Sequence, residues 1–416
     1  MLPPFSAVAT SQSVVNNSQV LLGPEFGNQT MNVVDTTGPV LSAGTATGNS
    51  LVTGTEAGSL DVESTQTMPG NVTGGVVSGV SHVSITTQAG DVTSLGAGTG
   101  NTAVATSDGS QGGGALTGNF TQSAGASWSV RSETDWQAPN ATVNSAQVGS
   151  QAIVNSIDLA VTDTTSNVTT SQTSSALVDA EGGSEVGGGS GATIGYTPNT
   201  AAFSTTAVAN NLTATGSGDA SQTINSTQVA NGSLVQSAGF VDVGDGQTVQ
   251  NDSTATVNNV SVLNTQGPLT VNNSQENDTN FTHAQSVATD FQFGTGQATA
   301  LGVGNSVLAG NQGPSTDLNN VQVNTGGVQA QASFTGDNGY DATSSATAMG
   351  NAAIGYACSQ CGGVISINNS QVSSGGGVEA ESNTTITNTG GSNRSATGIA
   401  TAVGNNATFY VSKPSN

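Results

Sequence analysis

The sequence predicts an all-β protein, an elongated β-solenoid built from repeats of about 47 residues. Three observations lead to this prediction: one hexamer recurs, a Gly-Asn pair recurs in phase with it, and apolar and polar residues alternate with a period of two. Self-similarity at a fixed period of roughly 20–50 residues is typical of repeat architectures. The alternative fold is a Gly/Thr-rich β-sandwich array, which would need more large core residues than the chain contains.

The recurring hexamer has a glutamine at its fifth position and, in most copies, an asparagine at its second. Copies from residue 224 onward start 47, 47 and 49 residues apart, and the first two copies are also 47 apart. Two steps of 81 residues lie between them, which predicts diverged or shortened units there. The copies are VNNSQV at Val15, the weaker VESTQT at Val62, VNSAQV at Val143, INSTQV at Ile224, VNNSQE at Val271, LNNVQV at Leu318 and INNSQV at Ile367.

Equivalent side chains of neighbouring repeats should lie next to one another in such a fold. Asn and Gln at equivalent positions of stacked strands form side-chain hydrogen-bond ladders. We therefore expect the hexamer amides to form ladders between repeats. The candidate ladder residues are Asn16, Gln19, Asn225, Gln228, Asn272, Gln275, Asn319, Gln322, Asn368 and Gln371.

The second motif, Gly-Asn, starts at Gly48, Gly304, Gly350 and Gly404. It precedes the hexamer by 14 residues at the first two positions and by 17 at the third, where the additional residues fall in the cysteine-containing segment. Because Gly-Asn, Asn-Gly and Gly-Gly break the apolar runs about every 8–12 residues, these pairs are expected to be turns.

The apolar positions predict a narrow core of small side chains. Along Val328–Thr335, Val, Ala and Phe alternate with Gln, Ser and Thr, which places the apolar residues on one face of a strand. Most apolar positions are Ala or Val, and aromatic residues make up only 4% of the chain. We therefore expect little room for large rings.

The charge balance excludes several classes of partner. Charged residues make up 7% of the chain, against roughly 25% in typical soluble domains. The net charge is −23, which argues against nucleic acid, because phosphate binding requires Lys and Arg, and against an anionic membrane surface. Cationic polymers and divalent cations are compatible with it. No apolar run approaches the roughly 20 residues of a transmembrane segment.

The beginning of the chain predicts an export signal. Ala7-Val8-Ala9 fits the small-x-small pattern that precedes signal-peptidase cleavage. We interpret residues 1–9 as the remnant of a signal peptide whose true start lies upstream of Met1. Residues 10–416 are then a single repetitive β domain, with its best-defined repeats at 224–416.

The two cysteines, Cys358 and Cys361, are predicted to form a structural disulfide. A zinc site needs four ligands, and the two histidines, His82 and His283, are far away in sequence. A redox Cys-x-x-Cys belongs at a strand-to-helix junction, and the sequence shows no helix signal. In an exported chain a disulfide that closes an extended turn is the expected state.

The carboxylates form no convincing catalytic set. Three pairs alternate along predicted strands and share a face, but only Arg131 and Arg394 are available as catalytic cations, so we interpret the pairs as outer-face residues. Asp242 and Asp245 resemble a fragment of a calcium loop, without the glycine-rich calcium repeat. The sequence therefore predicts no catalytic, cofactor-binding or metal-binding residues. The pairs are Asp61/Glu63, Glu133/Asp135 and Glu379/Glu381.

Four features of the chain resemble one known family. They are VVNNSQV near the start, TQTMPGNVTGG from Thr65, the repeated ATAxGN segments and the late Cys-x-x-Cys-Gly-Gly. On these the chain resembles the holdfast anchor proteins of stalked alphaproteobacteria, the HfaD type. The resemblance implies export to the outer cell surface and attachment of an adhesive polysaccharide holdfast to the cell envelope, together with companion anchor proteins. It supplies no catalytic residues.

The sequence alone is also compatible with different functions. The segment ATALGVGNSVLAG from Ala298 is loosely similar to head repeats of trimeric autotransporter adhesins. A self-associating, amyloid-like surface fibre subunit and a β-helical polysaccharide-acting enzyme stay open as well. The scarcity of Lys, Arg and His argues against the enzyme.

Overall fold

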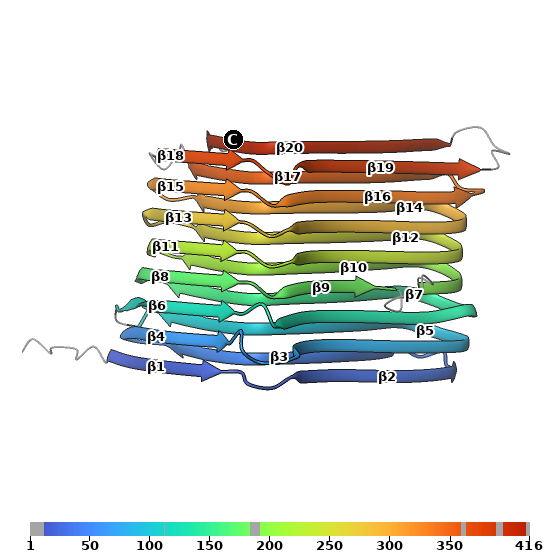
Figure 1. Cartoon of the computed structure of the whole chain (residues 1–416), viewed down its shortest axis with the longest axis horizontal. Helices are drawn as coiled ribbons and strands as arrows, with labels where there is room; N and C mark the ends of the chain where they lie inside the picture. The colour runs from blue at the N-terminus through green and yellow to red at the C-terminus, as the bar shows by residue number, and fades with distance from the viewer. Residues whose placement is uncertain (1–11, 112, 184–191, 359–362, 388–393, 413–416) are drawn as a thin grey trace, which may run out of the picture.

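The computed structural model describes residues 12–111, 113–183, 192–358, 363–387 and 394–412, and nearly all of these lie in β-strands. The predicted signal-peptide remnant, residues 1–9, lies outside the described residues. The strand pairs in the described part are parallel. The strands lie on one another in chain order, from β1 at one end to β20 at the other (Figure 1).

The described strands form two sheets. The eight-stranded sheet has the order β1 (Gln12–Val20), β4 (Ser59–Met68), β6 (Ala115–Ala124), β8 (Thr165–Ser174), β11 (Ser221–Ala230), β13 (Leu269–Asn277), β15 (Ser315–Asn324) and β18 (Val364–Ser373). The main path of the twelve-stranded sheet is β19 (Val378–Thr387), β16 (Gly327–Asp337), β14 (Phe281–Asn311), β12 (Leu234–Asn264), β10 (Ala192–Ser217), β7 (Trp128–Thr162), β5 (Gly75–Asp108) and β2 (Glu25–Asp35). Its remaining strands are β3 (Val40–Thr55), β9 (Leu177–Gly182), β17 (Asp341–Cys358) and β20 (Ser395–Ser412).

The long strands each contribute two walls of the molecule. Strands β5, β7, β12 and β14 are 31 to 35 residues long and pair with two different shorter strands. For example, β14 pairs with β16 through residues 281–290 and with β17 through residues 295–311. We define a layer as one strand of the eight-stranded sheet plus the strands of the twelve-stranded sheet that follow it in the chain. For example, β13 and β14 form one layer.

The structure is all-β, as predicted, but the predicted β-solenoid of about 47-residue repeats is wrong. In the middle of the chain the strand pairing closes on itself, because β7 pairs with both β9 and β10, and both of these pair with β12. The period is not constant either: along the eight-stranded sheet, equivalent glutamines are 47, 56, 50, 56, 47, 47 and 49 residues apart. Neighbouring layers need equal numbers of residues only where their strands pair. Connections between strands and β-bulges therefore accommodate the differences in layer length. The β-sandwich alternative is not found, since such arrays are antiparallel.

Side chains alternate between interior and solvent along each strand, as the period-two pattern predicts. In β15, every second residue from Thr316 to Asn324 is buried, and the residues between them are more exposed. The buried apolar residues form three clusters that each extend through many layers, and Ala and Val dominate them. The core is therefore long and narrow.

Large rings are nevertheless buried, so the expectation of little room for them is wrong. Trp128 and Trp136 are 0–1% exposed, and Phe293 packs edge-to-face on Phe334 with 5.0 Å between ring centroids. Glycines on neighbouring strands supply the space. A Cβ atom on Gly296 would lie 2.0 Å from the ring of Phe334. Phe334 pairs with Ala288, so Gly296 makes room for the ring from another part of β14. Such contacts between layers are not visible in the sequence of a single repeat.

We predict that Gly296→Ala destabilises the protein because the new methyl group overlaps the ring of Phe334. Overpacking a filled core typically costs about 1–3 kcal/mol. The matched control is Gly23→Ala, where a Cβ meets no atom within 4 Å and a change of roughly 0.5 kcal/mol or less is expected. Denaturant unfolding followed by circular dichroism measures both. Equal unfolding midpoints for the two variants would show that the ring space is not constrained.

Candidate functional site

A row of glutamines runs through the interior of the whole eight-stranded sheet. From Gln66 onward, each Nε2 donates to the Oε1 of the glutamine in the preceding layer at 2.7–2.9 Å. Each also donates to a main-chain carbonyl of the twelve-stranded sheet at 2.7–3.1 Å. The row therefore ties neighbouring layers and both sheets together. Its members are Gln19, Gln66, Gln122, Gln172, Gln228, Gln275, Gln322 and Gln371.

A row of asparagines faces it from the twelve-stranded sheet. From Asn49 to Asn351, each Nδ2 donates to the Oδ1 of the asparagine in the next layer at 2.7–2.8 Å. Its second N–H is donated to the main-chain carbonyl that follows a row glutamine, at 2.7–3.1 Å. The two rows run with opposite donor directions, so their amide dipoles oppose each other. The members are Asn49, Asn101, Asn155, Asn210, Asn258, Asn305, Asn351 and Asn405.

The two rows hold each other by reciprocal main-chain contacts. Gln275 donates to the carbonyl of Ser306, the residue after Asn305, at 2.8 Å. Asn258 donates to the carbonyl of Glu276, the residue after Gln275, at 2.9 Å. Fully satisfied polar networks of this kind rigidify a core and specify its register.

The ten predicted ladder residues divide between two places. The five predicted glutamines lie in the buried row, whereas the five predicted asparagines lie in an outward row of the same sheet. In that outward row Asn272 donates to Asn225 at 2.8 Å, and Asn319 donates to Asn272 at 3.0 Å. Asn16 and Asn368 occupy the same register position at its two ends.

The Gly-Asn pairs were predicted to be turns, and this prediction is wrong. Gly48, Gly304, Gly350 and Gly404 lie inside strands β3, β14, β17 and β20, and the asparagine that follows each one belongs to the buried row. The in-phase spacing with the hexamer was the signal for this row. The buried row was not recognised from the sequence because Asn and Gly are common in turns, and the pairs were therefore assigned to turns.

The hexamer copy at Val143 is also not part of the eight-stranded sheet. It lies in β7, where Val143 pairs with Ala89, and Asn144 donates to Asp91 at 2.6 Å. In this region the strands of the eight-stranded sheet are β6 and β8. They contain Gln122 and Gln172 at the glutamine position, but their other residues differ from the hexamer. This explains the two apparent steps of 81 residues.

The predicted disulfide stays a prediction, because Cys361 lies outside the described residues. Cys358 is half-buried at the end of β17, and its carbonyl accepts a hydrogen bond from the Gly363 N–H at 2.9 Å. Paired residues are 46 apart just before this segment and 49 apart just after it. The three additional residues therefore lie between Ala357 and Val364.

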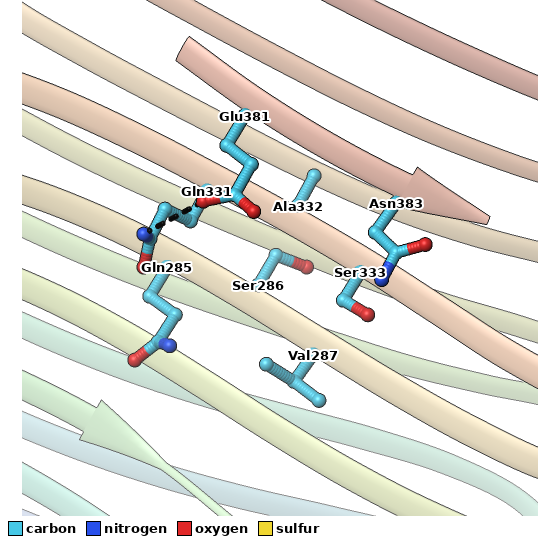
Figure 2. Close-up of a pocket in the computed structure, with 8 residues that line it drawn as sticks. All are labelled: Gln285, Ser286, Val287, Gln331, Ala332, Ser333, Glu381 and Asn383. Carbon is cyan, nitrogen blue, oxygen red and sulfur yellow. Dashed lines mark hydrogen bonds between the residues drawn. The ribbon is translucent and has the colours of Figure 1, made fainter. Parts of the chain in front are cut away.

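A hollow of about 250 Å³ lies on the outward face of the twelve-stranded sheet. Gln285, Gln331 and Glu381 come from three successive strands, β14, β16 and β19, and lie one above another at its edge (Figure 2). Gln331 donates to Glu381 at 3.2 Å, and its Oε1 lies 3.3 Å from Nε2 of His283. The remaining lining residues are Ser286, Val287, Ala332, Ser333 and Asn383.

Two further residues of β14, His283 and Phe281, lie close to this hollow. His283 packs on Phe281 with ring centroids 5.4 Å apart. Burial lowers the pKa of His283, and the contact with Gln331 opposes this shift, so the imidazole is favoured in its neutral form. His82, the other histidine, lies in β5 with its Nδ1 3.5 Å from Asp135. The structure thus places the two histidines in separate surroundings.

The three carboxylate pairs lie in different layers; Asp61/Glu63 and Glu379/Glu381 lie on outward faces, whereas Asp135 of the third pair is buried. Asp61 accepts from Thr117 at 2.9 Å and Glu63 from Asn119 at 3.0 Å, across neighbouring strands of the eight-stranded sheet. Glu379 accepts from Gln329 at 3.4 Å. These pairs take part in the same cross-layer contacts as the amides.

The third pair, Glu133/Asp135, belongs to a tighter group that sequence reasoning missed. Strands β7 and β9 place Arg131 beside Asp179 and Glu133 beside Glu181. Burial, with added repulsion from Asp179 and Glu133, raises the pKa of Glu181 to about 7, and Arg131 opposes this shift. Burial also raises the pKa of Asp179. Only the register between layers brings these carboxylates together, so the sequence offered no signal for them.

Asp242 and Asp245, which in sequence resemble a fragment of a calcium loop, lie near a third acid, Asp290. Burial raises the pKa of Asp290 to about 8, with smaller contributions from the charges of Asp245 and Asp242 and an opposing hydrogen bond from the Gln292 N–H. Its Oδ2 is buried without a hydrogen-bond partner. Among the described residues no group of three or more His, Cys, Asp and Glu is arranged to hold a metal ion.

These features define a class: an elongated, strand-rich protein whose outward walls carry rows of amides and carboxylates. Across the portion of the chain with described structure, no helix has the length and apolar character needed to cross a bilayer.

Comparison with known proteins identifies the family. The family model described as Holdfast attachment protein D (HfaD) matches residues 34–327. The chain therefore belongs to the HfaD family, and the predicted resemblance is confirmed. Neither the curated proteins nor the solved structures contain a significant match to the chain. The family name indicates a role in holdfast attachment.

We predict that Gln228→Leu lowers the free energy of unfolding by at least about 2 kcal/mol. The variant leaves the Gln172 oxygen, the Gln275 N–H and the Asn259 carbonyl without their partner, and each unsatisfied buried group costs about 1–3 kcal/mol. The control is Asn272→Leu in the outward row, where water can replace the lost bonds and a cost of roughly 1 kcal/mol or less is expected. Denaturant unfolding monitored by hydrogen exchange checks both. Equal losses would contradict a special role for the buried row.

We predict that the protein becomes less stable as pH rises from about 4 to 8. The folded state holds a proton on Asp290 up to a pKa of about 8, whereas the unfolded chain releases it near 3.8. The folded state thus binds more protons in this window, and stability falls with rising pH. Asp290→Asn should flatten the slope of unfolding free energy against pH, and Asp252→Asn serves as the exposed control for charge removal. An unchanged slope in the Asp290 variant would refute this assignment.

Proposed function

We propose that the chain is a non-enzymatic structural protein of the outer cell surface that fixes an adhesive polysaccharide holdfast to the cell envelope. Membership of the HfaD family supports the attachment role. The observation that supports a polysaccharide ligand is the outward wall of β14, β16 and β19, where Gln285, Gln331 and Glu381 lie in register beside the hollow.

The chemistry of this wall suits a sugar polymer. Each glutamine amide offers both donors and an acceptor, which matches hydroxyl groups that also do both. Parallel strands place these groups about 4.8 Å apart, so Gln285, Gln331 and Glu381 offer three polar contacts in series. A repeating polymer can therefore gain several weak contacts along this row.

The net charge of −23 supports a cationic component in the ligand or its partners. A polymer of amino sugars with free amines would be attracted by this field. Companion envelope anchor proteins would hold the chain in place, in keeping with the expected surface location. If charge contributes, binding should weaken as salt rises, because exposed charges are screened.

We predict that the double variant Gln285→Ala/Gln331→Ala lowers retention on immobilised holdfast polysaccharide by roughly tenfold, since two amides of the hollow are removed. The matched control is Asn225→Ala/Asn272→Ala, which removes two outward amides from the eight-stranded sheet. Pull-down or surface plasmon resonance at two salt concentrations measures the effect. Equal retention of both variants and the wild type would rule out this wall as the binding face.

Action on a polysaccharide is the second candidate, and one observation favours it. Glu181, whose pKa is raised to about 7, lies opposite Glu133, and such a pair could supply a general acid and a second carboxylate. A reducing-sugar assay on acidic and amino-sugar polymers separates the two functions. Turnover that Glu181→Gln abolishes would replace the structural proposal with an enzymatic one.

A further inference from the structure

The two ends of the molecule present open strand edges. Strands β1, β2 and β3 form the first layer, and β18, β19 and β20 form the last. Within the described residues each of these six strands has paired neighbours on one side only. Figure 1 shows the two layers at opposite ends of the stack. Such edges carry unpaired N–H and C=O groups and are templates for another chain.

The apolar clusters also end incompletely at both ends. Met31 and Val33 close one cluster at the first layer, and Ile386 closes it at the last layer, all only partly buried. A second cluster ends in the same way, with partly buried residues at both ends. These are Val15 and Leu51 in the first layer and Ile367 and Phe409 in the last layer. Each end therefore leaves apolar surface that one more layer would cover.

The glutamine row ends with complementary groups. Gln371 donates both N–H groups, to Gln322 and to the Asn406 carbonyl, so its Oε1 is left as an acceptor at the outer end. Gln19 accepts from Gln66 and donates one N–H to the Ser50 carbonyl. Its other N–H has no partner among the described residues. The last layer thus offers an acceptor and the first layer a donor.

The asparagine row ends with the opposite polarity. Asn49 donates to Asn101 and to the Thr67 carbonyl, which leaves its Oδ1 as an acceptor at the outer end of the first layer. Asn405 accepts from Asn351, and its Nδ2 has no acceptor in the described part of the chain. The two rows together make the last layer complementary to the first layer, and neither layer complementary to itself.

We propose that copies of this chain stack head to tail, with the last layer of one copy pairing in parallel with the first layer of the next. Both amide rows would then continue through the junction without a change of direction. Because the contact joins two different surfaces without closing a ring, it generates a linear filament.

The strands of the two layers match in length and in side chains. Strands β18, β19 and β20 are 10, 10 and 18 residues long, and β1, β2 and β3 are 9, 11 and 16. When Gln371 of one copy lies opposite Gln19 of the next, the established register brings like residues together. The resulting pairs are Ile367 with Val15, Asn369 with Asn17, Asn405 with Asn49, Ala402 with Ala46 and Ile386 with Val33.

The carboxylates of the last layer avoid those of the first layer in this register. Following the paired residues through successive layers places Glu379 opposite Phe26 and Glu381 opposite Asn28. One charge opposes the contact: Glu25 is exposed, but it pairs with the buried Val77, so a second copy would cover it opposite Val378. An inward-pointing charge on an edge strand restrains strand addition. Glu25 therefore sets how strongly the copies associate.

The experiment measures the association of the full chain by analytical ultracentrifugation and electron microscopy across protein and salt concentrations. Wild-type protein should form linear oligomers, more so at high salt, because salt screens the repulsion between copies of charge −23. Glu25→Gln should strengthen the association. Asn405→Asp, which removes the donor of the last layer, should weaken it roughly tenfold. Ser18→Asp, at an outward position of the first layer that lies opposite Ser370 and not opposite a carboxylate, is the control for an added charge.

Mixing two blocked variants tests the head-to-tail geometry. Gln19→Glu removes the donor of the first layer and Asn405→Asp that of the last layer, so each variant retains one intact end. Each variant alone should need roughly tenfold more protein than the wild type to form filaments. At the concentration at which the wild type associates, the mixture should form a dimer and no longer species.

Two results would overturn the proposal. One is that the wild type and Glu25→Gln both stay monomeric at high protein and salt concentrations. The other is that oligomers form but are unaffected by both end variants, which would indicate side-by-side association. Polysaccharide retention by each variant, measured separately, shows whether the attachment role holds independently of stacking.

Discussion

Two facing rows of buried amides hold the layers of this protein in register. Each amide satisfies its donors twice, once along the row and once across to the other sheet. A parallel strand that slipped by one residue would turn every amide outward and bury its polar neighbours instead. The slip would leave a column of buried carbonyls without donors, so the register of the whole stack depends on these rows. Hydrophobic contacts between Ala and Val side chains are too uniform to specify it.

This constraint leaves the rest of each layer free to vary. The connection between layers can gain residues, as it does between Ala357 and Val364, because it carries no row amide. The outward faces vary as well: the row of Asn225 contains Glu63 and Thr169 at equivalent positions. Because main-chain and amide contacts in the interior hold the layers together, the residue types on the outward faces can vary along the length of the protein. Such walls suit attachment to an extended polymer better than a single deep cleft would.

Two acids differ from the outward, hydrogen-bonded carboxylates because strand pairing buries them near other carboxylates. Glu181 and Asp290 are in or near groups of carboxylates from other layers or connections, and burial favours their protonated forms. Elsewhere, carboxylates such as Asp61 accept hydrogen bonds from hydroxyl or amide groups of the next layer. The strongly acidic composition is thus compatible with stacking because most charges are outward and have polar neighbours above or below.

The sequence by itself determined the strand content and the inward alternation, because these follow from a period of two that is visible in one chain. Of the eight glutamines in the buried row it singled out five, because the spacing changes between the layers of the other three. It also indicated the family, through four motifs that the chain shares with the HfaD type, and the family model confirms this. It misassigned the Gly-Asn pairs as turns, since local propensity says nothing about a partner one layer away. Only the tertiary structure decided that Val143 belongs to another sheet and that Gly296 makes room for Phe334. It alone brought Glu133 beside Glu181, because these contacts join residues whose spacing changes from layer to layer.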